Sequence, residues 1–98
     1  MTAAEVERAV EAAYGHYRPE AVKRGRNPAF PYVPVIRVAD LGAGQTTQIP
    51  KRAFATRDEA LNCARRQIDA YKSHFRKRVA DPRCRALREQ WGLPRELA

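Results

Sequence analysis

The stretch TRDEALNCARRQIDAYKSHF, residues 56–75, decides the fold of this 98-residue chain. It opens with a capping box, in which Thr56 and Glu59 satisfy backbone N–H groups at the start of a helix. Apolar residues then recur at steps of three and four: Leu61, Ala64, Ile68, Tyr71 and Phe75. Such spacing forms one apolar stripe, so this stretch predicts an amphipathic helix of about five turns.

The residues before this helix predict a small antiparallel sheet. Residues 33–38 have the β-branched content of a strand, and Pro34 restricts that strand to a sheet edge or places the proline at its start. Residues 40–44 have turn chemistry with two glycines, and residues 45–49 read as a second strand. Residues 51–55 form a short third strand in one version of this prediction, so the sheet is a hairpin or a three-stranded meander.

A helix is predicted at each end of the chain. Thr2 and Glu5 form another capping box, and the apolar spacing that follows predicts about four turns ending at Arg18–Pro19. Near the other end, Asp81–Pro82 predicts the start of a short helix, with aspartate as N-cap and proline at the first helical position. Gly92 is expected to end that helix in a Schellman-type stop. The predicted fold class is therefore α+β.

The whole chain, residues 1–98, is predicted to be a single small domain. Within it, residues 18–31 are expected to be a proline-rich basic connector, and residues 93–98 a tail. Val, Leu, Ile and Phe together number only 18 of 98 residues, which indicates a thin core. A second copy of the chain could supply the missing burial, so a homodimer is one expected partner.

The sequence holds no recognisable catalytic or cofactor motif. Gly-x-Ser-x-Gly, a phosphate-binding glycine loop and His-Glu-x-x-His are all absent. Cys63 and His74 would lie about 16 Å apart along one helix axis, too far to share a zinc ion. We therefore expect a non-enzymatic protein with no metal, no cofactor and no small-molecule substrate.

The sequence also predicts the compartment. Its apolar runs fall short of the roughly 18 residues that a membrane span needs, and residues 1–5 lack the basic start and apolar stretch of a secretory signal. We expect a cytoplasmic protein without membrane contact, in which Cys63 and Cys84 remain reduced.

Positive charge is the strongest functional signal. The net charge is +8, and residues 65–88 hold nine bases and two acids. Arg83 and Arg85 would lie in the first turn of the C-terminal helix, where the helix dipole disfavours cations. A bound polyanion would balance this charge. The expected phosphate contacts are Arg76, Lys77, Arg78, Arg83, Arg85 and Arg88.

Residues 23–28, KRGRNP, contain an Arg-Gly-Arg core that resembles the AT-hook, a short peptide that binds the minor groove of A·T-rich DNA. The resemblance implies that Arg24 and Arg26 form a DNA-binding arm in addition to this main patch. Asn27 stands where the AT-hook has proline.

A second resemblance covers residues 32–78, where predicted strands precede FATRDEA (54–60) and the long helix. This layout is similar to the ethylene-response-type DNA-binding domain, to the arm-type N-terminal domains of tyrosine recombinases and to small bacterial proteins of unassigned function. It implies that the sheet enters the major groove with the helix behind it. Arg37, Lys51 and Arg52 would then be the strand charges.

Our leading hypothesis is a module that binds nucleic acid mainly through phosphates, with little sequence readout. Base stacking is not predicted, because the helical stripe assigns Tyr71 and Phe75 to the core. The alternative is a protein-interaction or structural module, including a homodimer. In that alternative, Glu5, Glu7 and Glu11 pair with the basic surface of the same chain or of a second copy.

Overall fold

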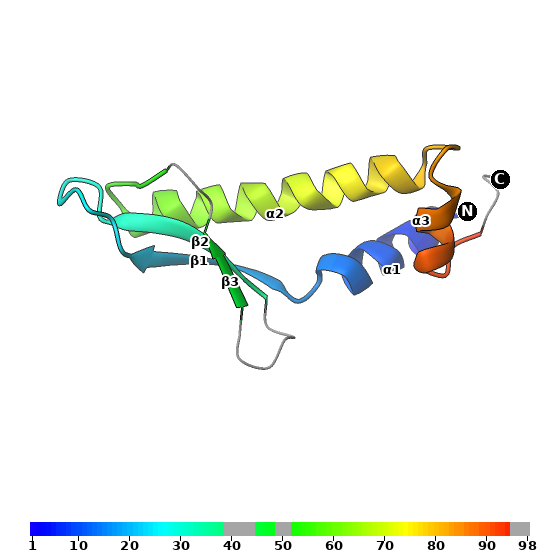
Figure 1. Cartoon of the computed structure of the whole chain (residues 1–98), viewed down its shortest axis with the longest axis horizontal. Helices are drawn as coiled ribbons and strands as arrows, with labels where there is room; N and C mark the ends of the chain where they lie inside the picture. The colour runs from blue at the N-terminus through cyan, green and yellow to red at the C-terminus, as the bar shows by residue number, and fades with distance from the viewer. Residues whose placement is uncertain (39–44, 49–51, 95–98) are drawn as a thin grey trace. The chain divides into compact units, whose positions relative to one another are not determined.

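The computed structural model describes residues 1–38 and 52–94 and the backbone of residues 45–48 (Figure 1). Its elements in chain order are α1 (Ala3–Tyr14), β1 (Tyr17–Lys23), β2 (Tyr32–Val38), β3 (Gln45–Gln48), α2 (Arg57–Val79) and α3 (Arg85–Gln90). The predicted α+β class is confirmed, with a helix at each end, an antiparallel hairpin and one long helix. The chain divides into two compact units, Met1–Gly15 with Ala70–Ala98, and His16–Asp69.

The unit of residues 16–69 contains the sheet, whose strand order is β1-β2-β3. β1 and β2 pair over seven residues, from Tyr17 opposite Val38 to Lys23 opposite Tyr32. β3 pairs with residues 35–38 only, which follow Pro34 in β2. β2 is the middle strand, and Pro34 is its third residue, opposite Ala21 of β1.

The prediction of a connector at residues 18–31 is wrong for its first six residues, because they belong to β1. Tyr17, expected in the first helix, is also in this strand, and α1 ends at Tyr14. Continuous pairing with β2 outweighs the local proline signal here. Pro19 is tolerated because β1 is at the edge of the sheet, where an outward-facing backbone N–H is not needed for pairing.

The strand expected at residues 51–55 is not formed in the part that the structure describes, residues 52–55. Phe54 makes a single bridge to Tyr32, with N–H···O distances of 2.7 and 3.1 Å in the two directions. The expected strand at 45–49 is present as β3 up to Gln48. Lys51, Ile49 and the turn expected at 40–44 lie outside the described residues.

Both faces of β2 are covered. Residues 33–36 are all buried, and successive side chains of a strand point to opposite faces. The first half of α2 lies alongside the sheet (Figure 1) and contributes buried Ala60, Ala64 and Ile68. This part of the predicted apolar stripe is confirmed.

The other unit packs α1 and α3 with the second half of α2 around an aromatic core. Its buried residues are Ala9, Val10, Phe75, Val79 and Leu93. The ring of Phe75 makes edge contacts with Tyr14 and Trp91, with centroids 5.8 and 5.9 Å apart. Phe75 is thus a core residue, as the spacing predicted.

The start of α1 and the end of α3 follow their local signals. The capping box of Thr2 and Glu5 is confirmed, with N–H···O distances of 3.2 and 3.0 Å. Gly92 has a φ of 69°, and the N–H groups of Gly92 and Leu93 bond to Glu89 and Arg88, which confirms the Schellman stop.

The third helix does not start at Asp81–Pro82. α3 begins at Arg85, with Cys84 at the N-cap position. The Asp81 carboxylate accepts a hydrogen bond from the Arg83 backbone N–H at 2.9 Å, and the Cys84 N–H bonds to the Asp81 carbonyl at 3.0 Å. These bonds close a turn over residues 81–84, because aspartate competes well for nearby backbone donors.

Candidate nucleic-acid interface

The cations expected at the end of α2 and the start of α3 are only partly available. Arg76 donates two hydrogen bonds to Glu7, Nε to Oε1 at 2.6 Å and Nη2 to Oε2 at 3.0 Å. Arg83 forms a similar fork on Asp81, at 3.1 and 2.9 Å. Two of the six predicted phosphate-binding residues, Arg76 and Arg83, are therefore already paired with carboxylates of the same chain.

The effect of these pairs on ionisation agrees with the geometry. Hydrogen bonds from the side chain and backbone of Arg83 lower the pKa of Asp81 from 3.8 to about 2. The hydrogen bond from Arg76 lowers the pKa of Glu7. Both carboxylates are therefore held in the charged form that balances their arginines.

Arg88 is a structural residue. Its side chain is buried, with 2% of the residue exposed, and Nη1 donates to the Val79 carbonyl at 3.2 Å and to the Asp81 carbonyl at 2.7 Å. The last carbonyls of a helix have no partner within that helix, and Arg88 supplies one just where α2 ends. Its predicted place in an exposed phosphate-binding patch is inconsistent with this burial.

Four of the six cations are exposed, and one of these, Arg83, is paired with Asp81; the other three are Lys77, Arg78 and Arg85. Within the described part of the chain, none of them forms an ion pair. Arg83 is not in the first turn of a helix, where the dipole was expected to disfavour it, because this residue precedes α3. We call Lys77, Arg78 and Arg85 the junction cations, because they lie at the end of α2 and the start of α3.

The Arg-Gly-Arg core lies in the hairpin loop, residues 24–31, which joins β1 to β2. Three hydrogen bonds order this loop: Gly25 N–H to the Pro31 carbonyl at 2.9 Å, Phe30 N–H to the Asn27 carbonyl at 2.9 Å, and Ala29 N–H to Asn27 Oδ1 at 3.0 Å. Arg24 and Arg26 are both exposed. The loop therefore presents two arginines on a closed turn.

Gly25 is required by the closure of the hairpin loop. A Cβ at this position would collide with the carbonyl oxygen of Phe30 and would lie 2.8 Å from Pro31 Cα. Real Cβ atoms essentially never approach other atoms this closely. Close packing within the loop thus accounts for the glycine, and Asn27, in the position of the AT-hook proline, forms an Asx-type turn.

The charge around the hairpin loop is positive, and few acidic residues lie near it in the sequence. Glu20 accepts a 2.7 Å hydrogen bond from Arg37 Nε, which is the main cause of the lowered pKa of Glu20; Arg24 and Arg57 lower it further. Arg24 and Arg57 therefore lie close enough to Glu20 to act on the same carboxylate. The sequence has no acidic residue from Ala21 to Ala39.

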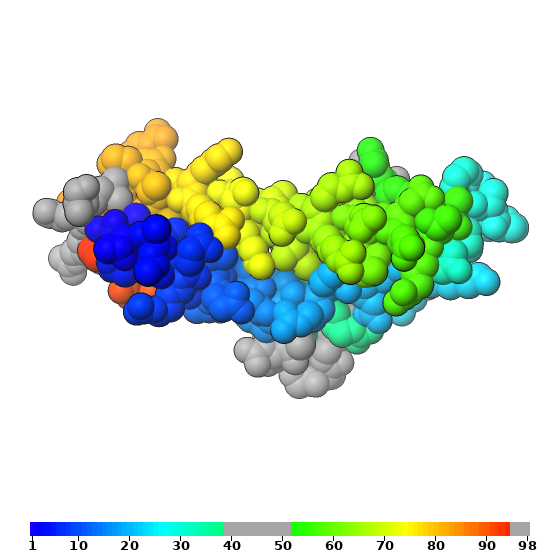
Figure 2. Space-filling model, turned by 180° about the vertical axis from the view of Figure 1, so that it is seen from behind, coloured from blue at the N-terminus to red at the C-terminus, as the bar shows by residue number. Residues whose placement is uncertain are grey.

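We define the hairpin-loop surface as Lys23, Arg24, Arg26 and Arg57. All four residues are exposed, and none forms an ion pair with a residue that the structure describes. Figure 2 shows the loop, in cyan, at the molecular surface beside the start of α2, in green. The acids nearest in sequence to Arg57 are Asp58 and Glu59, in the first turn of α2.

Sequence reasoning missed Phe30. Its exposed fraction is 47%, and it is the one large hydrophobic residue found exposed in the described part of the chain. The signal was present, because Phe30 lies in a loop bounded by Pro28 and Pro31, outside any apolar periodicity. An aromatic residue in such a place is not assigned to a core by its spacing.

The strand charges implied by the second resemblance are also placed. Arg37 is exposed and paired with Glu20, Arg52 is exposed, and Lys51 lies outside the described residues. One of the two described strand charges, Arg37, is therefore already paired with a carboxylate.

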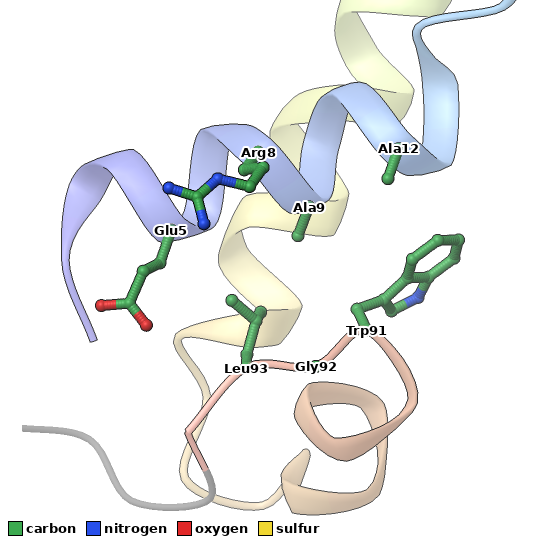
Figure 3. Close-up of a pocket in the computed structure, with 7 residues that line it drawn as sticks. All are labelled: Glu5, Arg8, Ala9, Ala12, Trp91, Gly92 and Leu93. Carbon is green, nitrogen blue, oxygen red and sulfur yellow. The ribbon is translucent and has the colours of Figure 1, made fainter.

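A small pocket of about 220 Å³ lies in the unit of α1 and α3 (Figure 3). Its lining residues are Glu5, Arg8, Ala9, Ala12, Trp91, Gly92 and Leu93. The pocket is smaller than the roughly 300–1,000 Å³ usual for small-molecule sites. We interpret it as a surface depression between α1 and the chain that follows α3.

Metal ligands do not cluster in the residues that the structure describes, where no three His, Cys, Asp or Glu side chains lie together. Cys63 and Cys84 are half-buried and form no disulfide with each other. In the same residues, no helix has both the length and the apolar character needed to cross a membrane.

Comparison with protein-family models, with curated proteins and with solved structures found no match to this chain.

Proposed function

We propose that this protein is a non-enzymatic module that binds nucleic acid through phosphate contacts made mainly by the hairpin-loop surface. One observation carries the proposal: Arg24 and Arg26 are exposed on an ordered loop, and neither is paired with an acid that the structure describes. Between the end of α2 and α3, by contrast, Arg76 and Arg83 are paired with carboxylates, and Arg88 is bonded to backbone carbonyls.

Simple electrostatics supports this choice of surface. A cation that already has a bidentate carboxylate partner has its charge largely balanced and two of its five N–H donors in use, so it gains less from a phosphate. The exposed arginines of the loop give up only water and counterions, and release of counterions from the nucleic acid favours binding. An ordered loop also loses less conformational entropy on binding than a flexible segment.

The junction cations are a second, weaker contact surface in this proposal. Lys77, Arg78 and Arg85 are exposed and unpaired within the described residues. Their number is half of that expected from the sequence, so we assign them a smaller share of the affinity than the hairpin-loop surface.

The test compares two variants that remove the same charge from different places. Fluorescence anisotropy would measure affinity of the full chain for duplex and single-stranded DNA of equal length at low and moderate salt. We expect Arg24→Gln/Arg26→Gln to weaken binding more than Arg78→Gln/Arg85→Gln. For duplex DNA, removing one arginine–phosphate interaction should reduce the slope of log affinity against log salt by about 0.9.

Two results would count against the proposal. Absence of binding at low salt would overturn nucleic-acid binding itself. An equal or smaller effect of the loop variant would overturn the choice of surface. Sedimentation velocity on the free protein tests the alternative, because a homodimer would sediment faster as protein concentration increases.

A further inference from the structure

The exposed ring of Phe30 is not explained by the packing of the hairpin loop. Its backbone N–H bonds to the Asn27 carbonyl, and its carbonyl oxygen lies close to Gly25. The residue nevertheless remains 47% exposed. The loop therefore presents an aromatic residue at the surface on a hydrogen-bonded backbone.

The neighbours of Phe30 indicate what this ring can bind. A single exposed apolar side chain is ordinary on a protein surface. Phe30 differs because the closing bond from Gly25 to Pro31 brings the two ends of the loop together, with Arg24 and Arg26 on either side of Gly25. Aromatic rings beside cations are the combination with which proteins bind single strands, since bases stack on the ring and phosphates contact the cations.

We propose that Phe30 stacks on an unpaired base while Arg24 and Arg26 contact the adjacent phosphates, so that the hairpin loop prefers single-stranded nucleic acid. This inference rests on the proposed function and adds the kind of strand that the loop recognises. A phenyl ring can stack only on a base whose face is free, and the bases of an intact duplex already stack on each other. Stacking also tolerates any base, because every base has a π-face.

The two parts of the proposed interaction predict different signatures. Removing the ring abolishes stacking and leaves the charge unchanged, so single-strand affinity falls while its salt dependence stays the same. Removing the arginines abolishes their phosphate interactions, so both affinity and salt dependence fall for either kind of strand. These signatures separate this inference from the function on which it rests.

The experiment uses the full chain, a fluorescent oligothymidine and a duplex of equal length. Phe30→Leu keeps an apolar side chain without a ring, and Phe30→Trp keeps an aromatic ring. We expect Phe30→Leu to bind the single strand at least about five-fold more weakly, the lower end of the effect of one stacked base. Phe30→Trp should bind like the wild type or more tightly, and duplex affinity should change less than about two-fold in both variants, because a paired base offers no free face. Circular dichroism and thermal unfolding check that each variant folds.

Three outcomes would overturn the inference. If Phe30→Leu binds oligothymidine like the wild type while Arg24→Gln/Arg26→Gln is weakened, stacking fails and phosphate binding stands. If Phe30→Leu weakens duplex and single-strand binding equally, the preference for an unpaired base fails. If the wild-type chain binds no nucleic acid at low salt, the inference and the proposed function fail together.

Discussion

A single guanidinium can stabilise a helix end as effectively as it can bind a phosphate, and burial separates the two roles. Arg88 donates to the Val79 and Asp81 carbonyls and is almost fully buried. Without Arg88 the Val79 carbonyl would lose this charged donor, and an unsatisfied buried acceptor costs more than the net value of the bond itself. The Asp81 carbonyl would keep the Cys84 N–H. This residue therefore belongs to the stability of the fold.

We predict that Arg88→Met lowers the free energy of unfolding by about 2–3 kcal/mol, because methionine keeps much of the buried stem and removes both hydrogen bonds. Urea unfolding followed by circular dichroism measures the change. The matched control is Arg85→Met, three residues earlier and exposed, which we expect to change stability by less than about 0.5 kcal/mol. Equal effects in the two variants would contradict the structural role of Arg88.

Asp81 gives a pH-dependent prediction. Its pKa in the folded chain is about 2, below the ordinary value of 3.8, so folding favours the ionised carboxylate. The stabilising contribution is therefore complete above about pH 4 and declines as the pH falls through about 2. Carboxyl-carbon NMR should place the Asp81 midpoint near 2 in the wild type and nearer to 3.8 in Arg83→Gln. A midpoint that does not move would show that Arg83 is not its cause.

At the scale of elements, the hairpin loop depends on one close approach of backbone. Gly25 lies where any Cβ would meet the Phe30 carbonyl and Pro31, so the bond from Gly25 to Pro31 survives only with glycine. Because this bond closes the loop that carries the arginines and Phe30, the proposed binding surface depends on loop closure.

We predict that Gly25→Ala opens the hairpin loop and destabilises the chain by about 1–3 kcal/mol, as overpacked substitutions usually do. Amide hydrogen exchange should become faster at residues 25 and 30, whose N–H groups bond within the loop. Ala29→Ser, at an exposed position of the same loop, is the control and should leave both exchange rates unchanged. Unchanged exchange in Gly25→Ala would mean that the loop closes without glycine.

Local signals account for the elements that form independently of distant partners. The apolar stripe of α2, the hydrogen bond from the Glu59 N–H to the Thr56 hydroxyl, the capping box of Thr2 and the stop at Gly92 all depend on residues within one or two turns. β1, the end of α1 at Tyr14 and the start of α3 at Arg85 were not predicted. They depend on pairing with β2 or on the competing turn at Asp81, and local propensity carries little information about either.

At the scale of the whole molecule, both units are positively charged. Residues 16–69 carry ten bases and five acids, and the other unit carries nine bases and six acids. With a net charge of +8, the positive side chains repel one another and destabilise the folded state. We therefore expect salt to stabilise the folded chain and to weaken the proposed binding of nucleic acid.

We predict that raising sodium chloride from about 0.05 to 0.5 M increases the unfolding temperature of the free protein, because screening weakens this repulsion. Over the same range, affinity for nucleic acid should fall steeply. Differential scanning calorimetry and anisotropy titration in identical buffers measure the two trends. An unfolding temperature that falls with salt would show that attractive ion pairs, such as Glu7–Arg76, outweigh the repulsion.

The sequence by itself determined the α+β class, the long helix, its caps and the excess of positive charge, because each depends on composition or on neighbours within a few residues. Only the tertiary structure decided which cations remain available. Glu7 and Arg76 are 69 residues apart in the chain, and Arg88 is buried against the end of α2. Ion pairing and burial are contacts in space, so the charge of an arginine is evident from the sequence while its freedom to bind is not.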